Sequence, residues 1–174
     1  MKLKDALNTM KYAGLIENDF TNGEGVCTAL FLQGCPFRCK GCHNPDTWDF
    51  EGGIEIEEET LIQNIIKAIC ANGIQRNLSI LGGEPLCAQN LNFTKLLITR
   101  IKQIYPTIKI NIWTGIEFSH LQQNLNEYSE ILSQADLLVT GRFILELRDI
   151  TLPLRGSSNQ EIWRRNNGWH IDKN

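Results

Sequence analysis

Short apolar runs alternate with longer amphipathic stretches along most of this sequence. The apolar runs have the length and composition of buried strands. They lie at residues 28–33, 78–81, 108–113 and 137–139. Between them, apolar residues recur at spacings of three and four, which predicts three helices. These stretches cover residues 57–69, 91–104 and 118–132.

The ends of two predicted helices carry further signals. Glu57, Glu58 and Glu59 lead the first helix, where negative charge suits the positive end of the helix dipole, and Gly73 is placed to end it. Pro106 stops the second. Strands that alternate with helices indicate an α/β fold with a mostly parallel sheet and right-handed crossovers.

A glycine follows each predicted strand, and these glycines mark one edge of the sheet. They are Gly34, Gly82 with Gly83, Gly115 and Gly141. The carboxyl ends of parallel strands share an edge, which is where such folds bind ligands. Because glycine lets backbone approach a ligand closely, we expect a binding site at this edge.

Composition and charge narrow the function classes. The chain has 174 residues, 42% of them hydrophobic and 21% charged, which fits a single globular domain. A net charge of −3 provides no bulk attraction to phosphate backbones, so we expect no nucleic-acid partner. The N-terminal segment MKLKDALNTMKYAG is too polar for a secretory signal, and no apolar run approaches the roughly 20 residues of a membrane span. We therefore expect a cytoplasmic protein without a membrane anchor.

Three of the six cysteines are grouped, in the loop after the first predicted strand. The sequence Cys35-Pro-Phe-Arg-Cys39-Lys-Gly-Cys42 places three thiols close enough to converge on one metal centre. The other three are scattered and fit small buried hydrophobic residues better than ligands. These are Cys27, Cys70 and Cys87.

The grouped thiols favour an iron-sulfur cluster over zinc. Structural zinc takes four protein ligands, and no second cysteine pair exists here. His43 could supply a fourth ligand, but next to Cys42 it would have difficulty turning its ring toward the same ion. Three thiolates on a four-iron cluster leave one iron open, as substrate binding requires. Zinc and three unliganded thiols remain as alternatives at this point.

Two motifs together carry a resemblance to a known family. Cys35-x-x-x-Cys39-x-x-Cys42 resembles the signature of the radical S-adenosylmethionine (SAM) superfamily, and Gly82-Gly83-Glu84-Pro85 resembles its SAM-binding motif. Further segments resemble the activating proteins of anaerobic (class III) ribonucleoside-triphosphate reductase. These are Asn22-Gly23-Glu24-Gly25, Cys42-His43-Asn44 with Thr47-Trp48, Trp113-Thr114-Gly115 and residues 154–160. The resemblance runs from about residue 19 to residue 160.

This resemblance implies one [4Fe-4S] cluster on Cys35, Cys39 and Cys42, which serve as its metal ligands and form the catalytic centre. An electron from a reduced flavodoxin- or ferredoxin-like donor would cleave SAM to methionine and a 5'-deoxyadenosyl radical. That radical would take a hydrogen from a glycine of the reductase and leave a stored glycyl radical. The chemistry belongs to the cofactors, and the protein supplies position and shielding.

The resemblance also implies which residues contact SAM. The glycines of the second motif allow close backbone approach, Glu84 with nearby carbonyls receives the ammonium, and Pro85 holds the turn. Residues 41–43 surround the adenine, and Thr114 with Gly115 borders the ribose and methionine. The implied contacts are Gly41, Cys42, His43, Gly82, Gly83, Glu84, Pro85, Thr114 and Gly115.

The fold implied is a partial, open radical SAM (β/α) barrel of about four or five strands, whose open side would admit a macromolecular substrate. It would be one domain over 1–174, with a core at about 19–145 and a C-terminal extension at 146–174.

Two positions depart from the wider superfamily. Gly41 stands where many members have an aromatic residue, as is common in the reductase-activating branch, and Thr140 stands where relatives are often acidic, which leaves the ribose contact open.

Other functions stay open on the sequence alone. A radical SAM enzyme could instead activate another glycyl radical enzyme of the pyruvate formate-lyase type, or act in deazapurine synthesis. A non-enzymatic iron-sulfur or zinc module would offer no reason for residues 82–85. Individual motif segments also have plain interpretations: Asn22-Gly23 as a turn, Trp48 as a packing residue and 156–160 as a solvated loop.

Overall fold

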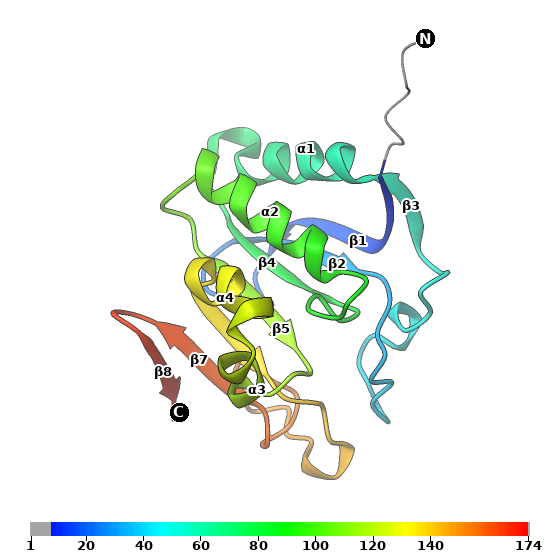
Figure 1. The fold of residues 1–174 in the computed structure, drawn as a ribbon, viewed down its shortest axis with the longest axis vertical. Coiled ribbons are helices and arrows are strands. Elements are labelled where there is room, and N and C mark those ends of the chain that lie inside the picture. The colour runs from blue at the N-terminus through cyan, green and yellow to red at the C-terminus, as the bar shows by residue number, and fades with distance from the viewer. Residues whose placement is uncertain (1–7, 174) are drawn as a thin grey trace.

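The computed structural model describes residues 8–173, which form one eight-stranded sheet with helices packed on one face (Figure 1). The strand order is β3-β1-β2-β4-β5-β6-β7-β8. The strands are β1 Thr9–Asp19, β2 Cys27–Leu32, β3 Ile54–Glu57, β4 Asn77–Gly82, β5 Ile110–Thr114, β6 Leu137–Thr140, β7 Glu161–Arg165 and β8 Trp169–Asp172.

The helices follow the predicted order. The α-helices are α1 Glu58–Ile69, α2 Leu91–Ile104, α3 Phe118–Gln123 and α4 Leu125–Gln134. Short 3-10 turns lie at η1 Pro45–Thr47, η2 Ala71–Gly73 and η3 Leu145–Leu147. Within residues 8–173, none of the helices has the length and apolar character needed to cross a membrane. The first seven residues, which begin the segment considered above as a signal sequence, lie outside the described residues, as does Asn174.

The α/β class and the four central strands are confirmed, but the prediction of a mostly parallel sheet is wrong. Strands β2, β4, β5 and β6 pair in parallel, as their helical crossovers require. In the described residues four of the seven pairings are antiparallel, because β1 and β3 extend one edge and the hairpin β7-β8 extends the other. The strand number is therefore eight rather than four or five, and the sheet does not close into a barrel.

The third predicted helix is two helices, a second correction. The chain leaves helical geometry at Asn124, with φ −119° and ψ 52°, so that residue ends α3 and begins α4. Phe118, Leu121 and Tyr128 still reach the core, whereas Leu125 is 54% exposed. Both short helices pack on the same side of the sheet, so their apolar residues keep a spacing of three and four across the break. That spacing is why the sequence predicted one continuous helix.

The two faces of the sheet have different contents. The face toward the helices is apolar, and Leu30, Ile80 and Ile112 of three adjacent strands lie in the main core. Since side chains alternate along a strand, Ser79 and Asn111 point to the opposite face, where Asn111 donates to the Ser79 hydroxyl at 3.2 Å. On the same face, nearer the carboxyl ends of the strands, Phe31, Leu81 and Trp113 line the cavity described below.

The scattered cysteines agree with the prediction of small buried residues. Cys27 is fully buried and Cys87 is 8% exposed, and Cys70 is partly buried against the main core. Burial raises the pKa of the Cys27 and Cys87 thiols, so both stay neutral at physiological pH.

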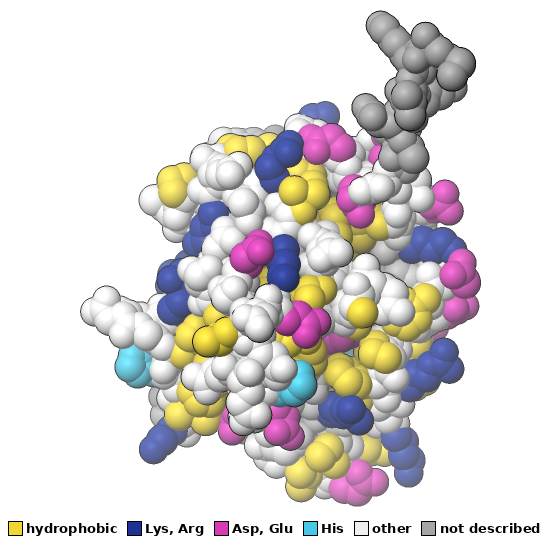
Figure 2. All heavy atoms as spheres, in the orientation of Figure 1, with side chains coloured by type: hydrophobic (Ala, Val, Ile, Leu, Met, Phe, Trp, Pro, Cys, Tyr) yellow, Lys and Arg dark blue, Asp and Glu magenta, His cyan; other side chains and the backbone are white. Residues whose placement is uncertain are grey.

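On the face that Figure 2 displays, side chains of both charge signs are interspersed over the helices.

One buried cation joins the end of α1 to β1. The Arg76 guanidinium is 1% exposed and donates to the carbonyls of Ala71 at 2.8 Å and Ile74 at 2.7 Å. It also donates to the Asn18 side-chain oxygen at 2.8 Å. These acceptors are partly buried, and the Ala71 carbonyl also accepts from the Ile74 N–H at 3.2 Å, so Arg76 adds to the pairing of the carbonyls just after α1.

We expect Arg76→Met to lower the free energy of unfolding by about 2 kcal/mol, because it removes a buried donor from the Asn18 side chain and from the Ile74 carbonyl. Urea unfolding measures this loss. Arg100→Met is the matched control, since Arg100 makes an exposed pair with Glu59 at 3.0 Å that should be worth less than about 1 kcal/mol. Equal losses in the two variants would contradict this account of Arg76.

Candidate active site

A cavity of about 620 Å³ lies at the carboxyl ends of the four parallel strands. It brings together segments that are far apart in the sequence, and most of the predicted site residues line it. These are Cys35, Cys39, Cys42, His43, Gly82, Gly83, Glu84, Thr114 and Gly115. Gly41 and Pro85 are not among the lining residues. The predicted edge of the sheet is therefore where the structure forms its cavity.

The cysteine loop is held closed at its base. Gly34 and Cys35 donate their backbone N–H groups to the carbonyls of Thr47 at 2.8 Å and Trp48 at 3.1 Å. Beneath them the buried Gln33 amide donates to the carbonyls of Asp46 and Asp49 at 2.9 and 2.7 Å. The loop is thus a fixed excursion from the end of β2, with its three thiols at the cavity wall.

The surroundings of the thiols combine burial with amide donors. Burial raises the pKa of the Cys35 thiol, while the backbone amides of Phe37 and Arg38 act in the opposite direction. Burial likewise raises the pKa of the Cys39 thiol, and the hydrogen bond from the backbone amide of Phe143 opposes this shift. Amides near sulfur stabilise a thiolate and, in a cluster, the cluster sulfurs. The Asn44 N–H donates to the Cys42 sulfur at 3.4 Å, so all three thiols have such donors and fit the ligand set of an iron-sulfur cluster. No three His, Cys, Asp or Glu side chains within residues 8–173 are grouped as a site for one metal ion.

Glu84 ties the end of β4 to the end of β5. Its carboxylate is 2% exposed and accepts hydrogen bonds from the Thr114 hydroxyl at 2.6 Å, the Gly115 N–H at 2.7 Å and the Leu86 N–H at 2.9 Å. Burial raises the pKa of this carboxyl, and the three donors oppose that shift. The side chain that the motif assigns to SAM therefore also fixes the cavity wall.

Close backbone approach explains two of the site glycines. A Cβ on Gly83 would lie 2.3 Å from the Gly34 carbonyl oxygen, so any side chain would separate the ends of β2 and β4. A Cβ on Gly115 would lie 2.4 Å from the Phe37 ring. The glycines bring the cysteine loop against the strand ends, which is a structural role in addition to any contact with a ligand.

Two residues that shape the cavity, Asn90 and Arg142, were not predicted from the sequence. The Asn90 amide is buried and donates to the carbonyls of Gln33 and Glu84, both at 3.0 Å, which joins β2 to β4. The Arg142 guanidinium lies 4.4 Å from the centre of the Phe37 ring, a cation–π contact on the cavity wall. Arg142 follows a strand-end glycine, a position that could have indicated it; Asn90 carried no such signal.

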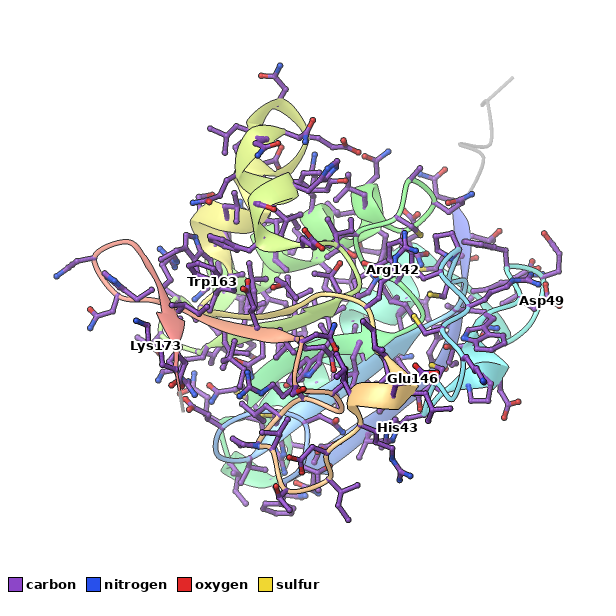
Figure 3. The ribbon with its side chains drawn as sticks, turned by 90° about the horizontal axis from the view of Figure 1, so that it is seen from below. His43, Asp49, Arg142, Glu146, Trp163 and Lys173 are labelled. Atoms are coloured by element: carbon purple, nitrogen blue, oxygen red, sulfur yellow. The ribbon has the colours of Figure 1, made fainter. Side chains whose placement is uncertain are left out.

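The segment after β6 closes against the cysteine loop. The Phe143 ring makes an edge contact with the His43 ring at 5.5 Å, and Figure 3 shows His43 beside the part of the segment that carries Glu146. Within residues 154–160, the Gln160 side chain accepts from the Gly156 and Ser157 N–H groups at 3.0 and 3.2 Å. These hydrogen bonds fix the conformation of residues 154–160, in contrast to the plain solvated loop considered above.

The remaining motif positions divide between the cavity wall and the sheet. Asn22, Trp48 and Trp113 line the cavity, and the Trp113 ring nitrogen donates to the Leu154 carbonyl at 2.7 Å. Thr140 is the last residue of β6 and does not line the cavity. Its buried hydroxyl has no hydrogen-bond partner among the described residues.

Comparison with known proteins agrees with this arrangement. A family model described as "4Fe-4S single cluster domain" matches residues 21–163. The anaerobic ribonucleoside-triphosphate reductase-activating protein of Vibrio cholerae is 36% identical over 156 residues, which cover 89% of this chain and 98% of that protein. This chain belongs to that activating-protein family. The Haemophilus influenzae member is 35% identical over 156 residues, again 89% of this chain and 98% of that protein. The phage T4 member is 31% identical over 164 residues, which cover 94% of this chain and 100% of that protein.

Membership of the activating-protein family confirms the resemblance drawn from the motifs. The matched region, 21–163, nearly coincides with the 19–160 span over which those motifs are spread. The cysteine loop, the Glu84 turn and the 154–160 loop all fall inside it and meet at one cavity.

Glu84 gives this family member a testable pH dependence. Because its pKa is raised in the folded state, the native protein keeps the proton to higher pH than the unfolded chain. The associated stabilisation is complete below the ordinary value of 4.5 and is lost as pH rises through the raised pKa. We compare the free energy of unfolding of the wild type with that of Glu84→Gln. Between pH 4.5 and the raised pKa of Glu84, we expect this difference to fall by up to about 1.4 kcal/mol per pH unit. Urea unfolding over a pH series measures it, and a difference independent of pH would contradict the assignment.

Proposed function

We propose that this chain activates an anaerobic ribonucleoside-triphosphate reductase by generating a glycyl radical on it through radical SAM chemistry. One observation carries the proposal. Three thiols from a single loop share a cavity with the Gly82–Glu84 strand end, in a chain whose relatives bear the name of such activating proteins.

Cys35, Cys39 and Cys42 would hold one [4Fe-4S] cluster, with the fourth iron free of protein ligands. When bound and reduced, the cluster supplies the electron that cleaves a carbon–sulfur bond of SAM, so that a deoxyadenosyl radical takes hydrogen from a glycine of the reductase. Burial raises the pKa of Cys35 and Cys39, so loading must release their protons. The nearby amides then compensate the thiolate charge.

The strand ends would bind SAM. The backbone of Gly82 and Gly83 comes close to the cavity, and the Glu84 carboxylate has already accepted three donors of about four that it can accommodate. A SAM ammonium would therefore take the last acceptor position on Glu84 together with backbone carbonyls. Pro85 holds this turn, as its carbonyl accepts from the Thr94 hydroxyl at 2.8 Å.

The other SAM contacts follow from the lining of the cavity. Thr114 and Gly115 would border the ribose and methionine, with Thr114 oriented by its bond to Glu84. Residues 41–43 would lie around the adenine, with the His43 ring held by Phe143. Gly41 does not itself line the cavity; its φ of 76° and the 2.8 Å that would separate a Cβ there from the Leu145 side chain make it the residue that would set the backbone of Cys42 and His43 for this contact.

The arrangement would suit a large substrate. We propose that the sheet acts as a partial barrel, with the helices outside and the opposite face of the sheet inside, so that a polypeptide enters from the open side. The electron would come from a reduced flavodoxin- or ferredoxin-like protein in the cytoplasm. The chain's own residues would shield the radical, with Phe37, Arg142 and Trp113 on the cavity wall.

Anaerobic turnover tests this function. After reconstitution with iron and sulfide and reduction, the wild type with SAM and the reductase should form 5'-deoxyadenosine and a glycyl radical visible by electron paramagnetic resonance. Cys39→Ala should lower both to background, since a three-thiolate cluster cannot form. Cys70→Ala is the matched control, because Cys70 packs partly buried on the main core, away from the cavity, and should keep both signals.

The outcomes separate the alternatives. Deoxyadenosine without a radical on this reductase, but with one on a pyruvate formate-lyase type enzyme, would assign the chain to that second substrate. Absence of deoxyadenosine despite an intact reduced cluster and a present reductase would leave only the binding-module interpretation.

A further inference from the structure

The cysteine loop presents alternate residues to its two sides. Cys35, Phe37 and Cys39 line the cavity. Arg38 and Lys40, which alternate with them, are exposed and are not among the lining residues. The loop therefore turns thiols toward the cavity and cations toward solvent. Because the thiols are only partly buried, a single stretch of chain separates the proposed cluster from the outer surface.

A third cation borders the same loop from the segment after β6. Arg142 is exposed at the edge of the cavity, and its guanidinium lies 4.4 Å from the centre of the Phe37 ring. Burial raises the pKa of the Cys39 thiol, and the positive charge of Arg142 acts in the opposite direction. The charge of Arg142 thus lies close to one of the proposed cluster ligands.

These three cations have no carboxylate partner. Arg38, Lys40 and Arg142 make no ion pair within residues 8–173. Elsewhere on the surface such pairs do form, as between Arg100 and Glu59 at 3.0 Å. Unpaired cations that share one part of the surface give it a positive potential, which attracts an anionic partner.

Exposed apolar side chains accompany the cations. Ile144 and Leu147 follow Arg142 on the same segment and are 39% and 42% exposed. In Figure 2, Lys and Arg side chains flank hydrophobic ones at the lower right, where Figure 1 places this segment and the cysteine loop. Apolar contacts with charges around them are typical of a protein interface rather than of a site for a small anion.

The position of this surface indicates which protein it fits. Under the proposed function, the reductase must bring a glycine into the cavity, whereas an electron donor has only to approach the cluster. A donor on Arg38 and Lys40 would meet the outer side of the cysteine loop and leave the cavity to SAM and the reductase. Electrostatic steering with a small contact area also suits a carrier that must bind and leave quickly.

We propose that Arg38 and Lys40, with Arg142, Ile144 and Leu147 beside them, form the docking surface for an acidic electron-donor protein of the flavodoxin or ferredoxin type. This rests on the proposed function and adds the place at which the electron enters.

Binding of a purified acidic flavodoxin to the reconstituted protein tests the proposal without turnover. Arg38→Glu and Lys40→Glu should each raise the Kd for oxidised flavodoxin about tenfold at low ionic strength, because each replaces an attraction by a repulsion. The difference should shrink as salt is added. Lys67→Glu is the matched control, since Lys67 is exposed on α1 without an ion pair and away from the cavity, and should bind as the wild type does.

Reduction kinetics separate docking from an effect on the cluster. The rate of cluster reduction by reduced flavodoxin should fall about tenfold in the two loop variants at low ionic strength. Photoreduced deazariboflavin, a small reductant that needs no docking surface, should reduce the cluster at the wild-type rate in each variant. With that reductant, the variants should also form deoxyadenosine and the glycyl radical as the wild type does.

Other results overturn the proposal. Wild-type Kd values in both loop variants contradict it, and so does slow reduction by deazariboflavin, which would place the cations in the cluster site itself. A raised KM for the reductase under chemical reduction would assign the surface to the reductase instead.

A second variant covers the case in which the charge reversals fail to fold by urea unfolding. Arg38 has a φ of 47°, which glycine adopts without steric cost, so Arg38→Gly removes the charge and keeps the backbone. A wild-type Kd in Arg38→Gly then refutes the proposal. Failure of the wild type to form deoxyadenosine with either reductant would refute the proposed function, whereas the flavodoxin titration reports on docking alone.

Discussion

The site depends on the hydrogen bonds that hold the carboxyl ends of β2, β4 and β5 together. Glu84 joins β4 to β5 because its buried carboxylate accepts from the Thr114 hydroxyl and the Gly115 N–H, and the Asn90 amide joins β2 to β4 through two carbonyls. Hydrogen bonds to a buried charge are worth about 1.5–3 kcal/mol each, and losing one partner leaves a costly unpaired group. These contacts place the cysteine loop, which begins at the end of β2, against the Glu84 turn.

Close packing adds to this constraint. Gly83 and Gly115 leave no room for a side chain, so the Gly34 carbonyl and the Phe37 ring lie directly on the strand ends. The thiols are consequently half-buried, and burial raises the pKa of Cys35 and Cys39. A site that keeps free thiols neutral, yet offers amides to their sulfurs, favours thiolates when a metal centre compensates their charge. If the proposed cluster binds these thiols, its loading would therefore release their protons.

The sequence predicted the parts whose pattern is local. The four central strands are short apolar runs, and the glycines after them mark the edge where the cavity lies. The outer strands escaped detection because β1 mixes polar and apolar residues around Gly14, and the β7-β8 hairpin carries arginine and tryptophan rather than an apolar run. Asn90 and Arg142 could not be placed, since their partners are distant in sequence and meet only in the folded chain.

The central claim is that the cavity brings a glycine of the reductase next to a radical derived from SAM. Activation of a reductase whose glycines carry deuterium at the α-carbon tests it most directly, with mass analysis of the 5'-deoxyadenosine formed. The account predicts that deuterium appears in deoxyadenosine in proportion to the glycyl radical formed. Deoxyadenosine without deuterium, beside a glycyl radical of normal yield, would contradict direct hydrogen transfer in this cavity.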